Sequence, residues 1–125
     1  MKQHTSKFLS LVNAAKQRIK EISPQELKTL LDSKEQVYII DVREENELKV
    51  GLIPNAIHLS KGVIERDIEK QIPDLAAHIV VYCSGGFRCA LVAHSLQEMG
   101  YTNVVSLATG LHGWVDAGFK LIPPA

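Results

Sequence analysis

A chain of 125 residues that is 46% hydrophobic and 22% charged has the composition of one globular domain, and it can bury a core without disulfide cross-links. Its 14 basic and 14 acidic residues balance, so the net charge gives no reason to expect a nucleic-acid partner. No apolar run approaches the roughly 20 residues of a membrane span. Two cysteines are no disulfide framework, so the expected location is the reducing cytoplasm.

Residues 1–20 are expected to form a basic helical extension. Phe8, Val12, Ala15 and Ile19 recur at helical spacing, and the stretch contains lysines and arginine but no acidic residue. The simplest explanation of this apolar stripe is a helix that packs across the domain. Binding to a membrane surface or to a partner helix stays open as an alternative.

The rest of the chain, residues 21–125, is expected to be one domain of alternating helices and strands. A helix start is clearest at Ser23, a favoured N-cap residue that is followed by Pro24 and by Glu26 at the third helical position. Short apolar runs with β-branched residues predict strands that are buried on both faces. In chain order, the predicted elements are a helix at 24–32, a strand at 37–41, a short helix at 44–49, a strand at 56–59, a helix at 62–71, a strand at 78–82, a helix at 88–99, a strand at 104–107 and a short helix at 110–118.

This alternation predicts an α/β fold. Helical crossovers between strands give a central, mostly parallel sheet of about five strands with helices on both faces. Ligands of such sheets lie outside the carboxyl ends of the strands. Asp41 and Cys83 each end a predicted strand, so both should lie at that edge of the sheet.

The loop after the strand at 78–82 is the candidate site. It brings Cys83 to the amino end of a helix, where unpaired N–H groups and the helix dipole favour an anion and lower the pKa of a thiol. Gly85 and Gly86 let the backbone turn its N–H groups inward, and Arg88 could complete a ring around an anion. A buried, inert cysteine is the alternative, but it leaves the Gly-Gly turn and the arginine without a purpose.

Several segments together resemble a single-domain rhodanese, a domain of the thiosulfate sulfurtransferase type, over essentially residues 21–120. They are Asp41-Val42-Arg43-Glu44, the run Gly51-Leu52-Ile53-Pro54-Asn55-Ala56-Ile57-His58-Leu59, the loop Cys83-Ser84-Gly85-Gly86-Phe87-Arg88, the run Met99-Gly100-Tyr101-Thr102-Asn103-Val104, and Gly110-Leu111-His112-Gly113-Trp114. The resemblance implies a rhodanese-like fold and a persulfide on Cys83, held in a cradle formed by Ser84, Gly85, Gly86, Phe87 and Arg88. It also implies that Asp41 and Arg43 have a structural role near the site.

The implied reaction is sulfur transfer. The Cys83 thiolate would attack the outer sulfur of a donor anion such as thiosulfate, and cyanide or a thiol would then accept this sulfur. Related phosphatase and arsenate-reductase domains use a loop one residue longer, whereas here arginine is the fifth residue after the cysteine, so a phosphatase is disfavoured. Two other classes stay open: a relay or regulatory module that delivers sulfur to a protein partner, and a non-catalytic interaction domain.

Several other residues have simpler explanations than a catalytic role. The sequence departs from the usual family pattern at Leu52, Asn55, Thr109 and Cys89. Cys89 could form a disulfide with Cys83 or resolve its persulfide, but the expected role is a small helical residue facing the sheet, because attack would require the loop to deform.

Phe87 is expected at the rim of the pocket, where it could shape a docking surface. Glu44, Glu45 and Glu47 are expected to form a solvated helix face, and His4, His58, His78, His94 and His112 show no metal-ligand spacing, so neither a metal nor an organic cofactor is expected.

Overall fold

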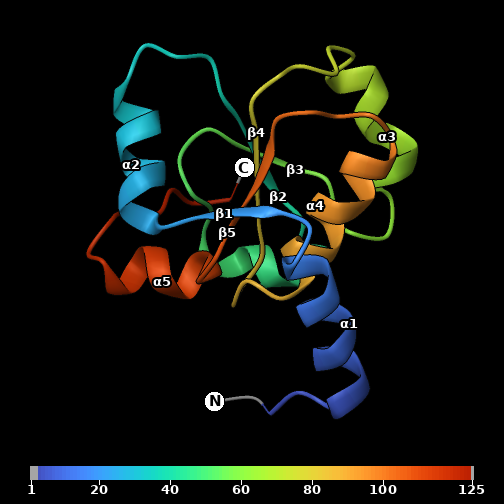
Figure 1. The fold of residues 1–125 in the computed structure, drawn as a ribbon. Coiled ribbons are helices and arrows are strands. Elements are labelled where there is room, and N and C mark those ends of the chain that lie inside the picture. Colours follow the sequence, from blue (N-terminus) through green and yellow to red (C-terminus); the bar gives the residue numbers. More distant parts are fainter. Residues whose placement is uncertain (1–2, 125) are drawn as a thin grey trace.

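The computed structural model describes residues 3–124 and has a five-stranded parallel sheet at its centre (Figure 1). The strands are β1 (Lys20–Ile22), β2 (Tyr38–Asp41), β3 (Ala56–His58), β4 (Ile79–Tyr82) and β5 (Val104–Leu107). Their order across the sheet is β1-β5-β4-β2-β3, and every neighbouring pair is parallel. The predicted α/β class with a parallel sheet is therefore confirmed.

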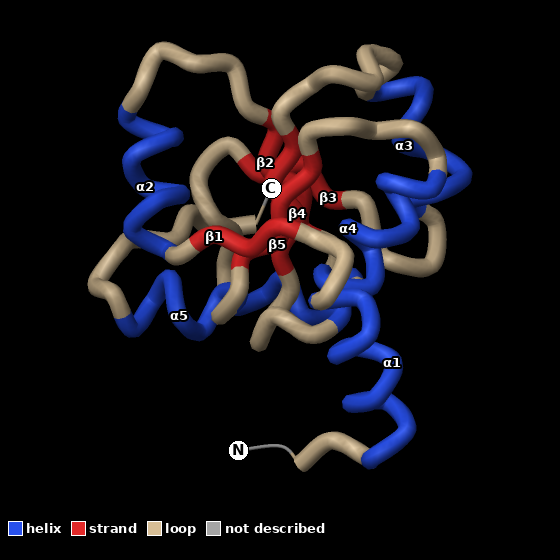
Figure 2. The backbone as a smooth tube through the Cα atoms, in the orientation of Figure 1, coloured by secondary structure: helices blue, strands red, loops and turns tan. Residues whose placement is uncertain are grey.

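Helices cover both faces of the sheet, as predicted (Figure 2). The helical elements are α1 (Ser6–Lys16), α2 (Pro24–Asp32), the 3-10 helix η1 (Glu45–Val50), α3 (Ile64–Gln71), α4 (Arg88–Glu98) and α5 (Gly110–Asp116). Helices α3 and α4 pack on one face of the sheet, and α2 and α5 on the other. In the part of the chain that the structure describes, no helix is both long and apolar enough to cross a membrane.

Local sequence signals explain most of these elements. At the start of α2, the Ser23 side chain accepts a hydrogen bond from the Glu26 amide at 3.1 Å, and the Glu26 carboxylate accepts one from the Ser23 amide at 3.0 Å. This is the predicted capping box. Every residue of β4 is buried, because parallel strands between two helical layers contact apolar side chains on both sides.

Strand β1 is where the sequence prediction was wrong. The sequence predicts a helical extension up to residue 20 and no strand there, whereas the helix ends at Lys16 and a strand begins at Lys20. With only three residues, of which only Ile22 is half-buried, this edge strand has no periodicity to recognise. It forms because its backbone pairs with β5.

Helix α1 packs against α4, and its apolar stripe faces that contact. Val12 and Ala15 are buried, and Phe8 and Ile19 are half-buried. The interpretation of this stripe as a packing surface therefore agrees with the structure. Figure 1 shows α1 beside the lower end of α4, which is the amino end that follows the Cys83 loop.

Candidate active site

The site begins where β4 ends. Cys83 follows Tyr82 directly, and Tyr82 is paired in register with Asp41 of β2, so both predicted site segments lie at the same edge of the sheet. The loop 83–88 then turns into α4, which begins at Arg88. The topology thus places Cys83 between the carboxyl end of a buried strand and the amino end of a helix.

Two backbone amides, one in the loop and one in the first turn of α4, point at the Cys83 sulfur. The Gly86 N–H donates a hydrogen bond to Cys83 Sγ at 3.2 Å, and the Cys89 N–H donates one at 3.5 Å. Gly86 has a φ of +93°, and a Cβ at this position would overlap the Ala108 carbonyl oxygen. Only glycine fits this position, because a side chain would be strained and would collide with the chain after β5.

A second glycine holds the loop from α5. Gly110 has a φ of +63°, and a Cβ there would lie 2.5 Å from the Ser84 carbonyl oxygen. The Leu111 amide also donates to the Cys83 carbonyl at 2.8 Å. The start of α5 therefore packs directly on the loop, a contact between distant segments that sequence spacing does not reveal.

The surroundings favour the ionised form of Cys83. A hydrogen bond from the Cys89 thiol is the largest cause, and together with the two backbone N–H groups and the nearby Arg88 charge it lowers the pKa of Cys83 to about 6, although burial acts in the opposite direction. The pKa of Cys89 is raised well above the usual thiol range, because its hydrogen bond to Cys83 and its burial both favour the protonated form. Cys83 therefore ionises first.

Alkylation of Cys83 by iodoacetamide should follow this lowered pKa. The rate should rise as the pH increases through about 6, where the thiolate forms, and should level off well below the ordinary thiol range near 8.5. Peptide mapping by mass spectrometry separates Cys83 from Cys89, which should stay unmodified over the same range. A midpoint near 8.5 for Cys83 would contradict the geometry of the loop.

Arg88 is bound to a carboxylate from another part of the chain. Its guanidinium donates two hydrogen bonds to Glu47, at 2.7 and 2.8 Å, and Ser84 Oγ donates to the same carboxylate at 3.2 Å. The bonds from Arg88 are the main reason that the pKa of Glu47 falls to about 2. The expectation that Glu47 belongs to a solvated helix face was wrong, because η1 turns this side chain toward the loop.

Asp41 and Arg43 form a buried ion pair beside the loop, with an N–O distance of 2.7 Å and almost no exposure of either side chain. The Arg43 guanidinium also donates to the Gly51 carbonyl at 2.8 Å and to the Glu47 carbonyl at 3.1 Å. The pair therefore ties the end of β2 to the middle of η1 and to the residue that follows it. Neither side chain is hydrogen-bonded to Cys83, and both hold the segment that presents Glu47.

Phe87 does not stand free at the rim. Its ring lies 4.4 Å from the His4 ring and 6.4 Å from the Phe8 ring, between centroids, and Lys16 Nζ lies 5.6 Å from its centre. The N-terminal segment and α1 thus cover the outer side of the loop. Cys83 is only 1% exposed, so a molecule that reaches its sulfur must first move the side chains at this rim.

Cys89 lies closer to Cys83 than expected. The two sulfurs are 3.4 Å apart, and Ser106 Oγ donates a hydrogen bond to Cys89 Sγ at 3.1 Å. Cys89 faces the sheet, as expected, and is fully buried. The sulfurs are in van der Waals contact, but a bond between them still requires an approach of about 1.4 Å, so the expectation that attack needs a movement of the loop stays a prediction.

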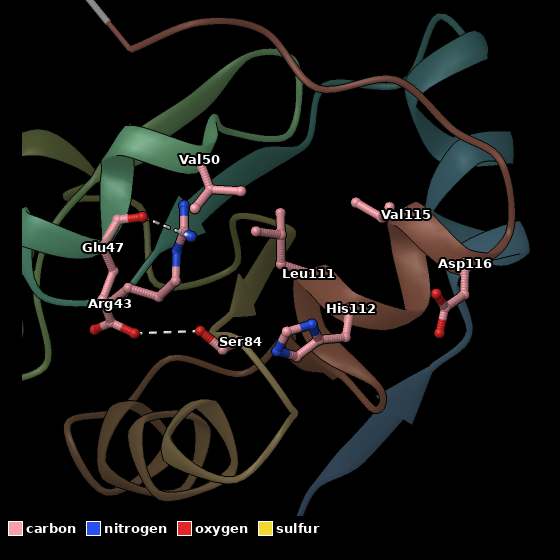
Figure 3. Close-up of a pocket in the computed structure, with 8 residues that line it drawn as sticks. All are labelled: Arg43, Glu47, Val50, Ser84, Leu111, His112, Val115 and Asp116. Atoms are coloured by element: carbon pink, nitrogen blue, oxygen red, sulfur yellow. Dashed lines mark hydrogen bonds between the residues drawn. The ribbon is translucent and has the colours of Figure 1, made fainter. Parts of the chain in front are cut away.

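A cavity of about 310 Å³ opens beside the loop, between η1 and α5 (Figure 3). Its lining residues are Arg43, Glu47, Val50, Ser84, Leu111, His112, Val115 and Asp116. Val50 and Val115 are exposed to solvent although they are apolar. Within residues 3–124, no group of three or more histidine, cysteine or acidic side chains could hold a metal ion.

A sequence model of the rhodanese-like domain matches residues 23–117, which include the whole loop and both glycines that hold it. The chain belongs to the rhodanese-like domain family. YtwF of Bacillus subtilis, named provisionally as a sulfurtransferase, is 36% identical over 77% of this chain and 90% of its own length. A sulfurtransferase of Allochromatium vinosum is 28% identical over 85% of this chain and 97% of its own.

Solved structures give the same assignment. The polysulfide-sulfur transferase of Wolinella succinogenes superposes with a TM-score of 0.80 at 29% identity, over 96% of this chain and 90% of that protein. The thiosulfate sulfurtransferase of Pseudomonas aeruginosa gives a TM-score of 0.85 at 26% identity, over 96% of this chain and 23% of that protein. These similarities support a sulfur-transfer role for this rhodanese-like chain.

Proposed function

We propose that this rhodanese-like chain is a sulfurtransferase that carries a sulfane sulfur as a persulfide on Cys83. The observation that supports it best is the pair of inward N–H groups on Cys83 Sγ, from Gly86 and Cys89, at 3.2 and 3.5 Å. They stabilise the thiolate that attacks the donor, and they could hold the negative charge of the persulfide in the same cradle.

The reaction balances as two displacements. The Cys83 thiolate attacks the outer sulfur of thiosulfate, the S–S bond of the donor breaks, and sulfite leaves with the electron pair. Cyanide or a thiolate then attacks the outer sulfur of the persulfide and restores the Cys83 thiolate. Neither a metal nor an organic cofactor takes part, because a thiolate is already a nucleophile and needs no separate general base.

The remaining loop residues would bind the donor. The half-buried rim consists of Ser84, Gly85, Phe87 and Arg88. Gly86 is buried and directs its N–H group at the Cys83 sulfur. Arg88 is the natural partner for a sulfonate, but two of its N–H groups are already bonded to Glu47. A donor anion would therefore compete with Glu47 for Arg88, which disfavours highly charged donors relative to a chain without this carboxylate.

The physiological acceptor could be a protein thiol, as in a sulfur relay. The observation in favour is the cavity beside the loop, whose apolar side chains Val50 and Val115 are exposed at its edge. One relative, the adenylyltransferase and sulfurtransferase UBA4 of Candida albicans, is 32% identical over 82% of this chain, which spans 25% of that protein. Comparing turnover of thiosulfate with transfer to protein thiols separates the two acceptor classes.

We place the start of the catalytic domain at β1, which begins at Lys20, and assign the preceding helix α1 to an extension that covers Phe87. A reducing compartment such as the cytoplasm suits this chemistry, because both cysteines are free thiols and Cys83 must be reduced to accept sulfur. The small substrates are a sulfur-donor anion and a thiol or cyanide acceptor.

Intact mass spectrometry tests the proposed function. After incubation with thiosulfate or polysulfide, the wild-type chain should gain the mass of one sulfur atom, and Cys83→Ser should gain none. Excess cyanide should then return the wild-type chain to its starting mass and yield thiocyanate. If Cys83→Ser gains sulfur to the same extent, or if the wild type gains none from any donor, the proposal is wrong.

A further inference from the structure

The proposed transfer reaction leaves one nucleophile unused. Cys89 lies in the first turn of α4 with its sulfur 3.4 Å from Cys83 Sγ, within van der Waals contact. A disulfide bond is about 2.05 Å long, so the two sulfurs need to approach by only about 1.4 Å to form one.

Burial favours Cys89 over acceptors from solution. Cys83 is 1% exposed and Cys89 is fully buried, so a dissolved thiol must displace rim side chains before it reaches the persulfide. Cys89 already stands beside the inner sulfur of that persulfide. In addition, Ser106 Oγ, at 3.1 Å, donates a hydrogen bond that would stabilise a thiolate on Cys89.

Loading with sulfur changes the relation between the two cysteines. In the free chain, the hydrogen bond that Cys89 donates to the Cys83 thiolate raises the pKa of Cys89, and burial and the charge of Cys83 raise it further. In the persulfide, the negative charge lies on the added outer sulfur, and Cys83 Sγ is no longer an anion. The repulsion and the hydrogen bond that kept Cys89 protonated are then weakened, while the bond from Ser106 stays.

We propose that Cys89 resolves the Cys83 persulfide and releases its outer sulfur as hydrogen sulfide, leaving a Cys83–Cys89 disulfide. This inference rests on the proposed persulfide and adds a second activity: dithiol-dependent release of sulfide from a sulfane-sulfur donor. The chemical class of substrate stays the same, but the second substrate becomes a dithiol reductant in place of a sulfur acceptor.

The step balances in atoms and electrons. Cys89 Sγ attacks Cys83 Sγ, a bond forms between them, and the bond from Cys83 Sγ to the outer sulfur breaks. The outer sulfur leaves with the electron pair, and together with the proton of Cys89 it forms hydrogen sulfide. The sulfane sulfur is thereby reduced by two electrons, and the two cysteines are oxidised to a disulfide, which a dithiol such as dithiothreitol reduces in the next step.

The test follows one round of loading without reductant. The wild-type chain and Cys89→Ser are charged with thiosulfate, freed of excess donor, and followed by intact mass and by sulfide assay. The wild type should first gain one sulfur atom and then fall to two hydrogens below its starting mass, with one sulfide released per chain. Cys89→Ser should keep the added sulfur and release no sulfide, and dithiothreitol should return the oxidised wild type to its starting mass.

Two further measurements test whether Cys89 is the attacking group. Ser106→Ala should gain sulfur as the wild type does but release sulfide more slowly, because Cys89 loses the hydroxyl that stabilises its thiolate. The rate of release should not depend on protein concentration, since the attack is intramolecular. If Cys89→Ser does not fold, Cys89→Ala also lacks the attacking thiol, but it loses the hydrogen bond to Cys83 and should gain sulfur more slowly, so only the fate of the added sulfur is compared. The wild-type arm alone can overturn the inference.

The outcomes separate the two proposals. A wild-type chain that gains sulfur and keeps it, or whose release is matched by Cys89→Ser, overturns the role of Cys89 and leaves the persulfide on Cys83 standing. Release that yields a disulfide-linked dimer also overturns it. A chain that gains no sulfur from any donor refutes the proposed function itself.

Discussion

Replacing Cys83 with serine should lower the turnover of thiosulfate and cyanide by roughly a thousandfold or more, since the atom that carries the sulfur is lost. A serine hydroxyl has a pKa far above that of a thiol, and two backbone N–H groups at 3.2 and 3.5 Å cannot ionise it near neutral pH. The measurement is the rate of thiocyanate formation at saturating donor, with thermal unfolding as a check that the variant is folded.

Cys89→Ser is the matched cysteine variant for this experiment. Its hydroxyl can still donate a hydrogen bond to the Cys83 thiolate, and it sits in the same buried position. Loss of the better-matched thiol should therefore cost no more than about tenfold, the value of one hydrogen bond. If both variants lose turnover equally, the assignment of Cys83 as the residue that carries the sulfur is contradicted.

Replacing Asp41 with alanine should destabilise the fold by about 3–5 kcal/mol. The Arg43 guanidinium would stay buried next to Tyr82 without its carboxylate partner, which now lies 2.7 Å away. The remaining bonds of Arg43, to the carbonyls of Glu47 and Gly51, cannot neutralise the charge. Urea unfolding followed by circular dichroism measures the loss.

The chain offers an exposed ion pair as the control. Asp32 pairs with Lys28 on α2 at 2.7 Å, but the Asp32 side chain is 62% exposed. Asp32→Ala should therefore change the stability by less than about 1 kcal/mol, because water solvates the lysine when its partner is removed. Similar losses for Asp32→Ala and Asp41→Ala would show that burial does not determine the cost.

Much of the fold was predictable because its signals are local. The capping box of α2 needs only Ser23 and Glu26, and short runs of β-branched residues predict the buried strands. Strand β1 was not predictable in this way, since its residues have no distinctive pattern and form a strand only because β5 offers a free edge. Its existence depends on a partner that is far away in the sequence.

The candidate site likewise has a part that local sequence predicts and a part that depends on contacts between distant segments. Sequence placed Cys83, Gly85, Gly86 and Arg88 in one turn, and the structure brings the Gly86 amide to the sulfur. The sequence did not reveal three contacts: Glu47 binds Arg88, Gly110 packs on the loop, and the His4 ring lies next to the Phe87 ring. Each of these contacts joins segments that are separated by a strand or a helix.

By itself, the sequence determined the α/β class, the loop that presents Cys83 and the family to which the chain belongs, because these depend on residues that are neighbours along the chain. Only the tertiary structure decided what surrounds that loop: the carboxylate that occupies Arg88, the helix that covers Phe87 and the second sulfur in contact with Cys83. The physical reason is that periodicity, caps and turns are encoded within a few residues. Contacts between distant segments follow from how the layers pack around the sheet.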